Sequence, residues 1–221
     1  MESREEMKMQ ISEEELNKAF DSRFPSDMSS KLQNAKVAVA GLGGLGSNIA
    51  VMLARSGVGH LRLIDFDVVD ITNLNRQMYL IPHIGMPKTE AIEQILCQIN
   101  PYLDYETICV KVTPDNVREL FDGYEIVCEA FDKADQKAML VSQVLAQCRD
   151  TIVVSGNGMA GIGDTNEIIT KKVMPRLYVC GDGKTDIGEG EGLIAPRVNA
   201  CASHQANKVL QLIMQNQRKE I

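Results

Sequence analysis

The stretch that decides the fold runs from Lys36 to Gly57 and reads KVAVAGLGGLGSNIAVMLARSG. KVAVA is short, apolar and β-prone, GLGGLG is a glycine turn, and the apolar residues of SNIAVMLARSG recur at helical spacing. A strand, a glycine turn and a helix in this order are typical of a nucleotide-binding unit, because the glycines allow a sharp turn and the helix N-terminus favours a phosphate. The alternative is a glycine-rich turn that serves only the packing of helix on strand.

Strands and helices alternate on both sides of this stretch. We predict further strands at 60–67, 105–112, 124–131 and 151–156, and helices at 88–100, 114–121, 135–148 and 195–215. Apolar strands separated by helices favour a parallel sheet covered on both faces, because crossover helices leave neither face to water. The sequence therefore predicts a Rossmann-like, doubly wound α/β fold with a mostly parallel sheet. Two glycine-rich stretches, 156–166 and 181–192, are expected to form loops.

The beginning of the chain has a different composition, rich in Glu, Lys and Ser. We predict an N-terminal arm over 1–34 with one short helix, opened by the capping box of Ser12 and Glu15. Residues 35–221 then form a single α/β domain, because neither a linker nor an internal repeat divides them.

Composition excludes several classes of protein. The 221 residues carry 23 Lys and Arg against 30 Asp and Glu, a formal charge of −7, which argues against a nucleic-acid binder with a broad positive surface. No apolar run approaches the roughly 20 residues of a membrane helix, and the charged start MESREEMKMQ is unlike a signal peptide, so we expect a cytoplasmic protein. None of the six cysteines has a neighbour at zinc-knuckle spacing, so we expect most of them to be core thiols: Cys97, Cys109, Cys128, Cys148, Cys180 and Cys201.

Polar residues follow the second predicted strand closely. Asp65 stands at the end of that strand, 19 residues after Gly46, where an acid can bind the hydroxyls of a ribose. Arg76 comes soon afterwards, with no room for a helix between, and its guanidinium would suit a polyphosphate. Taken alone, Arg76 is more simply an incidental arginine on a solvated loop.

These residues carry a family resemblance. The motif D-F-D-x-V-x-x-x-N-L-x-R-Q at 65–77, downstream of G-x-G-G-x-G, resembles the signature of the ubiquitin-activating-enzyme-like superfamily, specifically the bacterial ThiF- and MoeB-type adenylyltransferases that activate sulfur-carrier proteins. The resemblance continues with G-M-P-K at 85–88, I-N-P at 99–101 and Asp132 after a strand, and it covers roughly residues 36–157.

The resemblance implies an ATP site and a reaction. It assigns ATP binding to the four glycines and to a set of polar residues: Gly41, Gly43, Gly44, Gly46, Asp65, Asp67, Asn73, Arg76, Gln77 and Lys88. Arg76, Lys88 and Asp132 would be catalytic, with Asp132 holding Mg²⁺ and Asp67 in a minor supporting role. A partner's C-terminal carboxylate would attack the α-phosphate of ATP, giving an acyl-adenylate and pyrophosphate. Each of two residues also has an interpretation unrelated to the reaction: Lys88 could be a solvated lysine, and Asp132 could cap the following helix.

Other family features fit less directly. Many relatives hold zinc with two CxxC pairs, which this chain lacks, so we predict no zinc and the short, zinc-less ThiF form. Cys180 is the candidate for the thiol transfer that some relatives perform, although a cysteine ending a buried strand is the simpler interpretation. Relatives act as homodimers in which an N-terminal arginine reaches the other subunit's ATP; Arg23 is the candidate here, and a surface arginine is the alternative.

The leading hypothesis is ATP-dependent adenylylation of the C-terminal glycine of a small ubiquitin-fold sulfur carrier ending in Gly-Gly, with the thiamine-pathway carrier ThiS favoured. Two alternatives remain. The first is an NAD-dependent oxidoreductase, suggested by the glycine turn and Asp65 but lacking an identifiable catalytic residue. The second is a nucleotide-binding protein without turnover.

Overall fold

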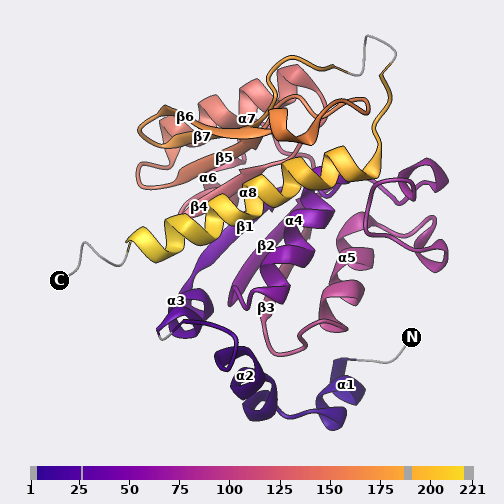
Figure 1. Cartoon of the computed structure of the whole chain (residues 1–221), viewed down its shortest axis with the longest axis vertical. Helices are drawn as coiled ribbons and strands as arrows, with labels where there is room; N and C mark the ends of the chain where they lie inside the picture. Colours follow the sequence, from indigo (N-terminus) through magenta and orange to yellow (C-terminus); the bar gives the residue numbers. More distant parts are fainter. Residues whose placement is uncertain (1–3, 26, 187–190, 217–221) are drawn as a thin grey trace.

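The computed structural model describes residues 4–25, 27–186 and 191–216. Its centre is a seven-stranded sheet in the order β3-β2-β1-β4-β5-β7-β6 (Figure 1). The strands are β1 (Lys36–Ala40), β2 (His60–Asp65), β3 (Asp104–Cys109), β4 (Ile126–Glu129), β5 (Ile152–Gly156), β6 (Ile169–Met174) and β7 (Leu177–Gly181). All neighbours pair in parallel except β6 and β7, which are antiparallel. The predicted doubly wound, mostly parallel α/β fold is confirmed.

Helices cover both faces of the sheet. One face packs against α4 (Gly44–Arg55), α5 (Lys88–Cys97) and α8 (Ala195–Asn216), and the other against α6 (Val117–Phe121) and α7 (Ala134–Gln147) (Figure 1). Two apolar cores result, one on each face, as parallel strands buried on both sides require. Short 3-10 turns occur at Ile71–Asn73, Ile81–His83 and Thr165–Glu167.

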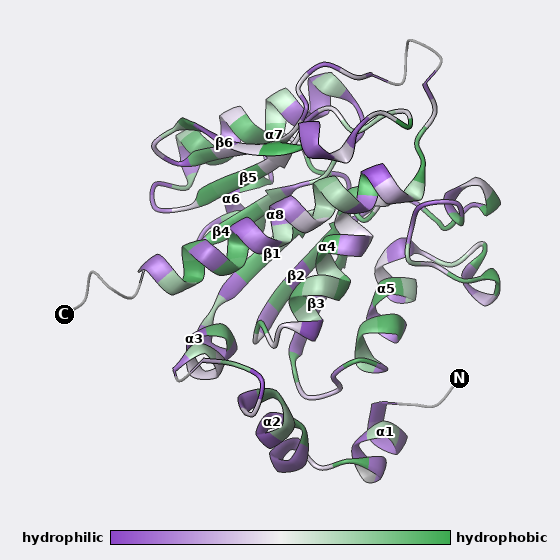
Figure 2. Ribbon diagram, in the orientation of Figure 1, coloured by the Kyte–Doolittle hydropathy of each residue, from purple (hydrophilic) through white to green (hydrophobic). Residues whose placement is uncertain are grey.

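One short helix was predicted in the N-terminal arm, but its described residues form three: α1 (Arg4–Gln10), α2 (Glu13–Asp21) and α3 (Met28–Asn34). The predicted capping box is present, since the Ser12 side chain accepts from the Glu15 amide and Glu15 accepts from the Ser12 amide. Helix α2 buries no residue and is largely hydrophilic (Figure 2), whereas α3 places Leu32 in the main core. Within this initial segment, α2 therefore lies on the periphery, whereas α3 is part of the domain's main core.

The structure differs from the predicted elements mainly after Gly156. Strands β6 and β7 complete the sheet there, where the sequence predicted loops and the final helix and gave the end of a buried strand only as an interpretation of Cys180. Three predicted strands also end earlier than expected, at Asp65, Cys109 and Glu129, because the chain leaves the ladder at the carboxyl edge of the sheet. None of the helices in the described ranges is both long and apolar enough to cross a membrane.

Candidate nucleotide site

The glycine turn lies where the connections of the sheet reverse direction. Strand β1 pairs with β2 on one side and β4 on the other, so the chain leaves the carboxyl end of β1 at a topological switch point. Crevices at such points are where open α/β sheets bind ligands. Asp65 ends β2 and accepts hydrogen bonds from the Leu42 amide at 2.6 Å and the Asp67 amide at 2.8 Å. Its carboxylate thus fixes the turn as well as standing beside it.

Glycines of the turn fall into two kinds. Gly41 has φ +89°, and a Cβ at Gly46 would lie 1.8 Å from the Gly41 carbonyl oxygen, so both positions require glycine for the backbone itself. At Gly43, within the described part of the chain, a Cβ would meet nothing nearer than Gln77 Nε2 at 3.8 Å. Gly43 is the N-cap of α4, and this open space at a helix N-terminus is suited to an anion.

Residues 73–79 are bound to the first turn of α4 by hydrogen bonds. Asn48 donates from Nδ2 to the Arg76 carbonyl at 3.0 Å and the Gly44 carbonyl at 2.6 Å. Tyr79 donates its hydroxyl to the Leu42 carbonyl at 2.8 Å, and burial raises the pKa of Tyr79, so it remains a donor. These bonds hold the segment that carries the arginine against the glycine turn.

Arg76 and Gln77 each have a side-chain polar atom near the glycine turn that makes no hydrogen bond within the described part of the chain. The Arg76 stem passes Gly44, where a Cβ would lie 3.4 Å from its Cγ, and Nη1 donates to the Thr72 carbonyl at 3.1 Å. Arg76 Nε and Gln77 Oε1 are buried without a partner among the described residues. Because buried polar atoms in native proteins are nearly always hydrogen-bonded, these two point to a polar ligand or water at the turn.

Lys88 is held near the same edge. It begins α5 with its side chain 8% exposed, and its Nζ lies 3.0 Å from Asp67 Oδ2. The structure therefore gives Asp67 a contact with the lysine, in addition to any contact with a nucleotide. Asn73 Oδ1 accepts from the Asp70 backbone amide at 3.1 Å, and this bond closes the 3-10 turn while leaving the side-chain Nδ2 of Asn73 available.

Asp132 follows β4 on a turn that lies against the glycine turn. A Cβ at Gly41 would be 2.9 Å from both the Ala130 carbonyl oxygen and Phe131 Cδ1. Asp132 itself is exposed. Across the described ranges there is no group of three or more His, Cys, Asp or Glu side chains able to hold a metal. A divalent ion at Asp132 would thus need ligands from the substrate and water, which is the usual arrangement for Mg²⁺.

Two predicted residues lie away from this site. Arg23 is exposed just beyond α2, whose Phe20 approaches Gly57 at the far end of α4 from the glycine turn. Within one chain it therefore does not reach the site. Cys180 is fully buried in β7, its Sγ is 3.3 Å from Thr170 Oγ1, and burial raises its pKa. This geometry is that of a core thiol, not of an activated nucleophile.

Three residues that no sequence motif identified each fix a segment of the site by donating to a backbone carbonyl: Asn48, Tyr79 and Lys137. An asparagine in the first turn after a glycine loop is a faint signal, because such residues often bind local backbone. Nothing in the spacing identifies the other two.

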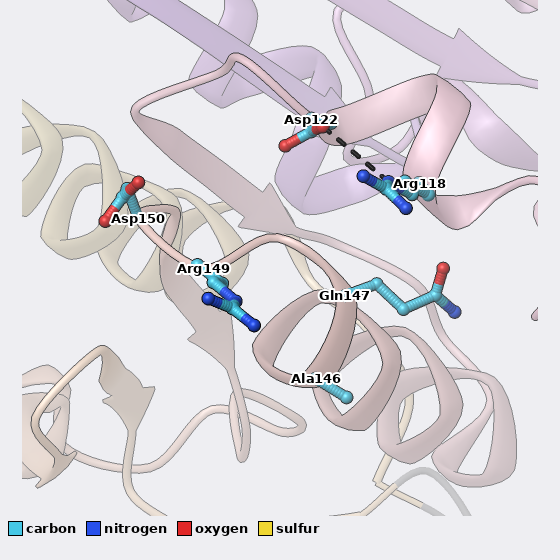
Figure 3. Close-up of a pocket in the computed structure, with 6 residues that line it drawn as sticks. All are labelled: Arg118, Asp122, Ala146, Gln147, Arg149 and Asp150. Atoms are coloured by element: carbon cyan, nitrogen blue, oxygen red, sulfur yellow. Dashed lines mark ion pairs between the residues drawn. The ribbon is translucent and has the colours of Figure 1, made fainter.

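A hollow of about 510 Å³ lies elsewhere, between the ends of α6 and α7 (Figure 3). Its charged lining residues are Arg118, Asp122, Arg149 and Asp150, and Arg118 Nε lies 3.8 Å from Asp122 Oδ2. These elements end where β4 and β5 begin, at the opposite edge of the sheet from the glycine turn. Its charges are balanced and exposed, so we assign the chemistry to the glycine turn instead.

Known proteins resemble this chain in sequence. Over 134 residues it is 35% identical to the adenylyltransferase and sulfurtransferase UBA4 of Scheffersomyces stipitis, covering 60% of this chain and 30% of the relative. Over 135 residues it is 38% identical to the tRNA threonylcarbamoyladenosine dehydratase of Bacillus subtilis, covering 60% and 52%. The matches thus span about half or less of these relatives.

A solved structure shares the fold over nearly its whole length. The E. coli tRNA N6-threonylcarbamoyladenosine dehydratase TcdA, in complex with ATP, superposes with a TM-score of 0.82 and 25% identity, covering 92% of this chain and 96% of that one. Comparison with protein families matches residues 16–221 to the ThiF family. The chain belongs to the ThiF family.

Proposed function

We propose that this chain transfers the adenylyl group of ATP to a carboxylate and releases pyrophosphate. The observation that carries the proposal is the buried donor Arg76 Nε, which has no partner among the described residues, together with the open space at Gly43. Both lie at the N-terminal end of α4, where a phosphate is favoured. Two relatives support the same activity, because UBA4 is an adenylyltransferase and TcdA has been crystallised with ATP.

The residues of the chain need only manage charge. A peptide C-terminal carboxylate has a pKa of about 3.5 and is already ionised at neutral pH, so the reaction needs no general base. Its oxygen attacks the α-phosphorus, the bond to the bridging oxygen of the β-phosphate breaks, and the electron pair leaves with pyrophosphate. Arg76 and Lys88 would offset the repulsion between two anions, and Asp65 would bind the ribose.

Asp132 would hold Mg²⁺ together with substrate phosphates and water, because an exposed carboxylate can supply one of the ligands of such an ion. Bound there, the ion would neutralise charge on the phosphates.

We further propose that the carboxylate belongs to the C-terminal glycine of a small ubiquitin-fold sulfur carrier, with a ThiS-type carrier as the first choice. The formal charge of −7 supports a protein substrate over a nucleic acid. In this proposal residues 35–221 form the catalytic domain and 1–34 the arm. Because Arg23 lies far from the site of its own chain, its predicted contact with ATP requires a homodimer.

A second candidate is the activation of the threonylcarbamoyl group of a modified tRNA. It is favoured by the match to TcdA, which covers 96% of that chain. The group carries a threonine carboxylate, so the same adenylyl transfer would apply. This candidate predicts that tRNA carrying the group, and not a carrier protein, stimulates the reaction.

The test is ATP–pyrophosphate exchange with Mg²⁺, measured with a carrier ending in Gly-Gly and separately with the modified tRNA. Exchange with the carrier, and an adenylate on its terminus by mass spectrometry, is the expected result. Exchange with neither substrate would refute adenylyl transfer. Binding of NADH more tightly than ATP would favour the oxidoreductase, and ATP binding without product would favour a binding protein.

A further inference from the structure

A fully buried carboxylate lies next to the proposed site and has no part in adenylyl transfer. Glu129 ends β4 with 0% exposure. It accepts hydrogen bonds from Ser155 Oγ at 2.5 Å and from the Phe131 amide at 2.8 Å, and Lys137 Nζ lies 3.1 Å from the carboxylate. A charged carboxylate is stable in the protein interior only when it is paired and hydrogen-bonded. The contacts with Glu129 therefore hold each of these partners in place.

Lys137 also makes a second contact, with the turn itself. Its Nζ donates to the Phe131 carbonyl at 2.8 Å. The backbone of Phe131 is therefore held on both sides, its N–H by Glu129 and its carbonyl by Lys137. Lys137 lies near the start of α7 and is partly buried, so the contact joins the helix to the turn that precedes it.

The turn is packed from two further directions. Gly41 leaves room for it, since a Cβ there would meet Ala130 and Phe131 at 2.9 Å. Gln205 of α8 donates from Nε2 to the Glu129 carbonyl at 3.1 Å. Asp132 is the next residue and extends from this fixed turn with its side chain exposed.

We propose that Lys137 is a positioning residue for Asp132: by binding the Glu129 carboxylate and the Phe131 carbonyl together, it fixes the direction in which Asp132 leaves the turn. The inference rests on the proposed function in taking Asp132 as the residue that holds Mg²⁺. A purely structural role, in which Lys137 only neutralises Glu129, makes a different prediction. In that case, removing both charges together would restore whatever the loss of the lysine impaired.

The experiment measures the affinity for ATP by calorimetry, once with Mg²⁺ and once with EDTA, for five variants. Lys137→Met removes both contacts. The double variant, Glu129→Gln with Lys137→Met, leaves no unpaired charge buried and should therefore fold. It still lacks the side chain that donates to the Phe131 carbonyl. Lys137→Arg keeps a donor, Asp132→Asn removes the proposed ligand, and Lys36→Met is the charge-matched control at the exposed start of β1.

We expect Mg²⁺ to strengthen ATP binding to the wild type and to the Lys36 and Lys137→Arg variants. This gain should fall by about 10-fold or more in Lys137→Met and in the double variant, with affinity in EDTA unchanged, because outer-shell partners affect metal binding to this extent. A normal gain in the double variant would overturn the proposal, as would a wild type that binds ATP equally with Mg²⁺ and EDTA. Since the readout is binding, a wild type with a normal gain but no pyrophosphate exchange would refute the proposed function alone.

Discussion

The two halves of the sheet differ in how they place ion pairs that have at least one buried side chain. From β1 to β5, two such pairs each lie within one βα unit: Lys88, which is buried, binds the half-exposed Asp67 at the start of α5, and Lys137 binds the buried Glu129 at the start of α7. After β5, the pair Asp182–Arg197 joins the turn after β7 to the first residues of α8. Both of its side chains are at most 2% exposed.

Asp182 connects several parts of the carboxyl-terminal half. Besides Arg197, it accepts from the Lys184 amide at 2.7 Å, the Thr185 amide at 2.9 Å and Thr185 Oγ1 at 2.8 Å. Arg197 Nη1 reaches the Asp164 carbonyl at 3.4 Å. The pair thus holds together loops that have little secondary structure of their own.

This difference shows which interactions hold each half of the molecule in its conformation. Regular βα units position the residues near the glycine turn, and Arg76 and Gln77 can keep atoms free for a ligand. The later loops depend on one buried pair. Helix α8, which contains the arginine of that pair, also packs against the site, because a Cβ at Gly44 would lie 3.1 Å from Val198 of this helix. Loss of the buried pair in the second half should therefore lower stability, whereas changes to the open or exposed site positions of the first half should lower binding or rate.

The largest effect is expected within the glycine turn. Gly46→Ala should prevent folding, because its Cβ would lie 1.8 Å from a carbonyl oxygen that cannot move away. Gly43→Ala should fold normally, since its Cβ has open space, but should lose ATP binding by filling the place of a phosphate. Circular dichroism and ATP calorimetry on both variants test this. If Gly43→Ala bound ATP with normal affinity, the phosphate could not lie at that position.

The next effect concerns the pair of the carboxyl-terminal half. Arg197→Met leaves Asp182 buried without its cation and should lower the free energy of unfolding by about 3–5 kcal/mol. Arg55→Met, at an exposed position on α4, is the control and should stay within about 0.5 kcal/mol of the wild type. Urea unfolding measures both. Equal stability of the two variants would show that the loops do not depend on the pair.

The same contrast explains how much the sequence could predict. Strands β1 to β5 were found because apolar strands and amphipathic helices alternate there, which is local information. Strand β6 is exposed at nearly every position and pairs only with β7, so ITKKVM has no alternation to reveal it. Its pairing depends on contacts that single-sequence periodicity does not contain.

The candidate site divides in the same way. The glycines, Asp65 and Arg76 stand in contiguous motifs, so residue type and spacing identified them. Lys137 was missed because its role arises from the fold, which brings its Nζ to a carbonyl six residues earlier. A lysine in an amphipathic helix carries no mark of such a contact.

A third effect should appear in rate and not in stability. Asp132→Asn should reduce pyrophosphate exchange by about 100-fold or more, the usual loss when one group that stabilises charge in the transition state is removed. The unfolding midpoint should not change, because the Asp132 side chain is exposed. Stopped assays with each substrate and a urea titration measure the two. Full activity would remove Asp132 from the mechanism; the structure does not make it a helix cap either, because the N-cap of α7 is Lys133.

The smallest effect is a pH dependence that belongs to the second half. Burial raises the pKa of Asp182, but the hydrogen bonds from Thr185 and Lys184 and the nearby Arg197 outweigh it and hold that pKa below its usual value. The unfolded chain therefore takes up this proton first as the pH falls, so the stabilising contribution is present above about pH 4 and is lost below it.

Asp182→Asn should test this contribution, because the amide cannot titrate. The variant should be less stable than the wild type at pH 7, and the difference in urea midpoint should shrink as the pH is lowered from 5 towards 3. The remaining carboxylates titrate in both proteins, so the comparison isolates Asp182. A difference that stays constant from pH 7 to pH 3 would mean that the charge of Asp182 does not hold the loops, and that its geometry alone does.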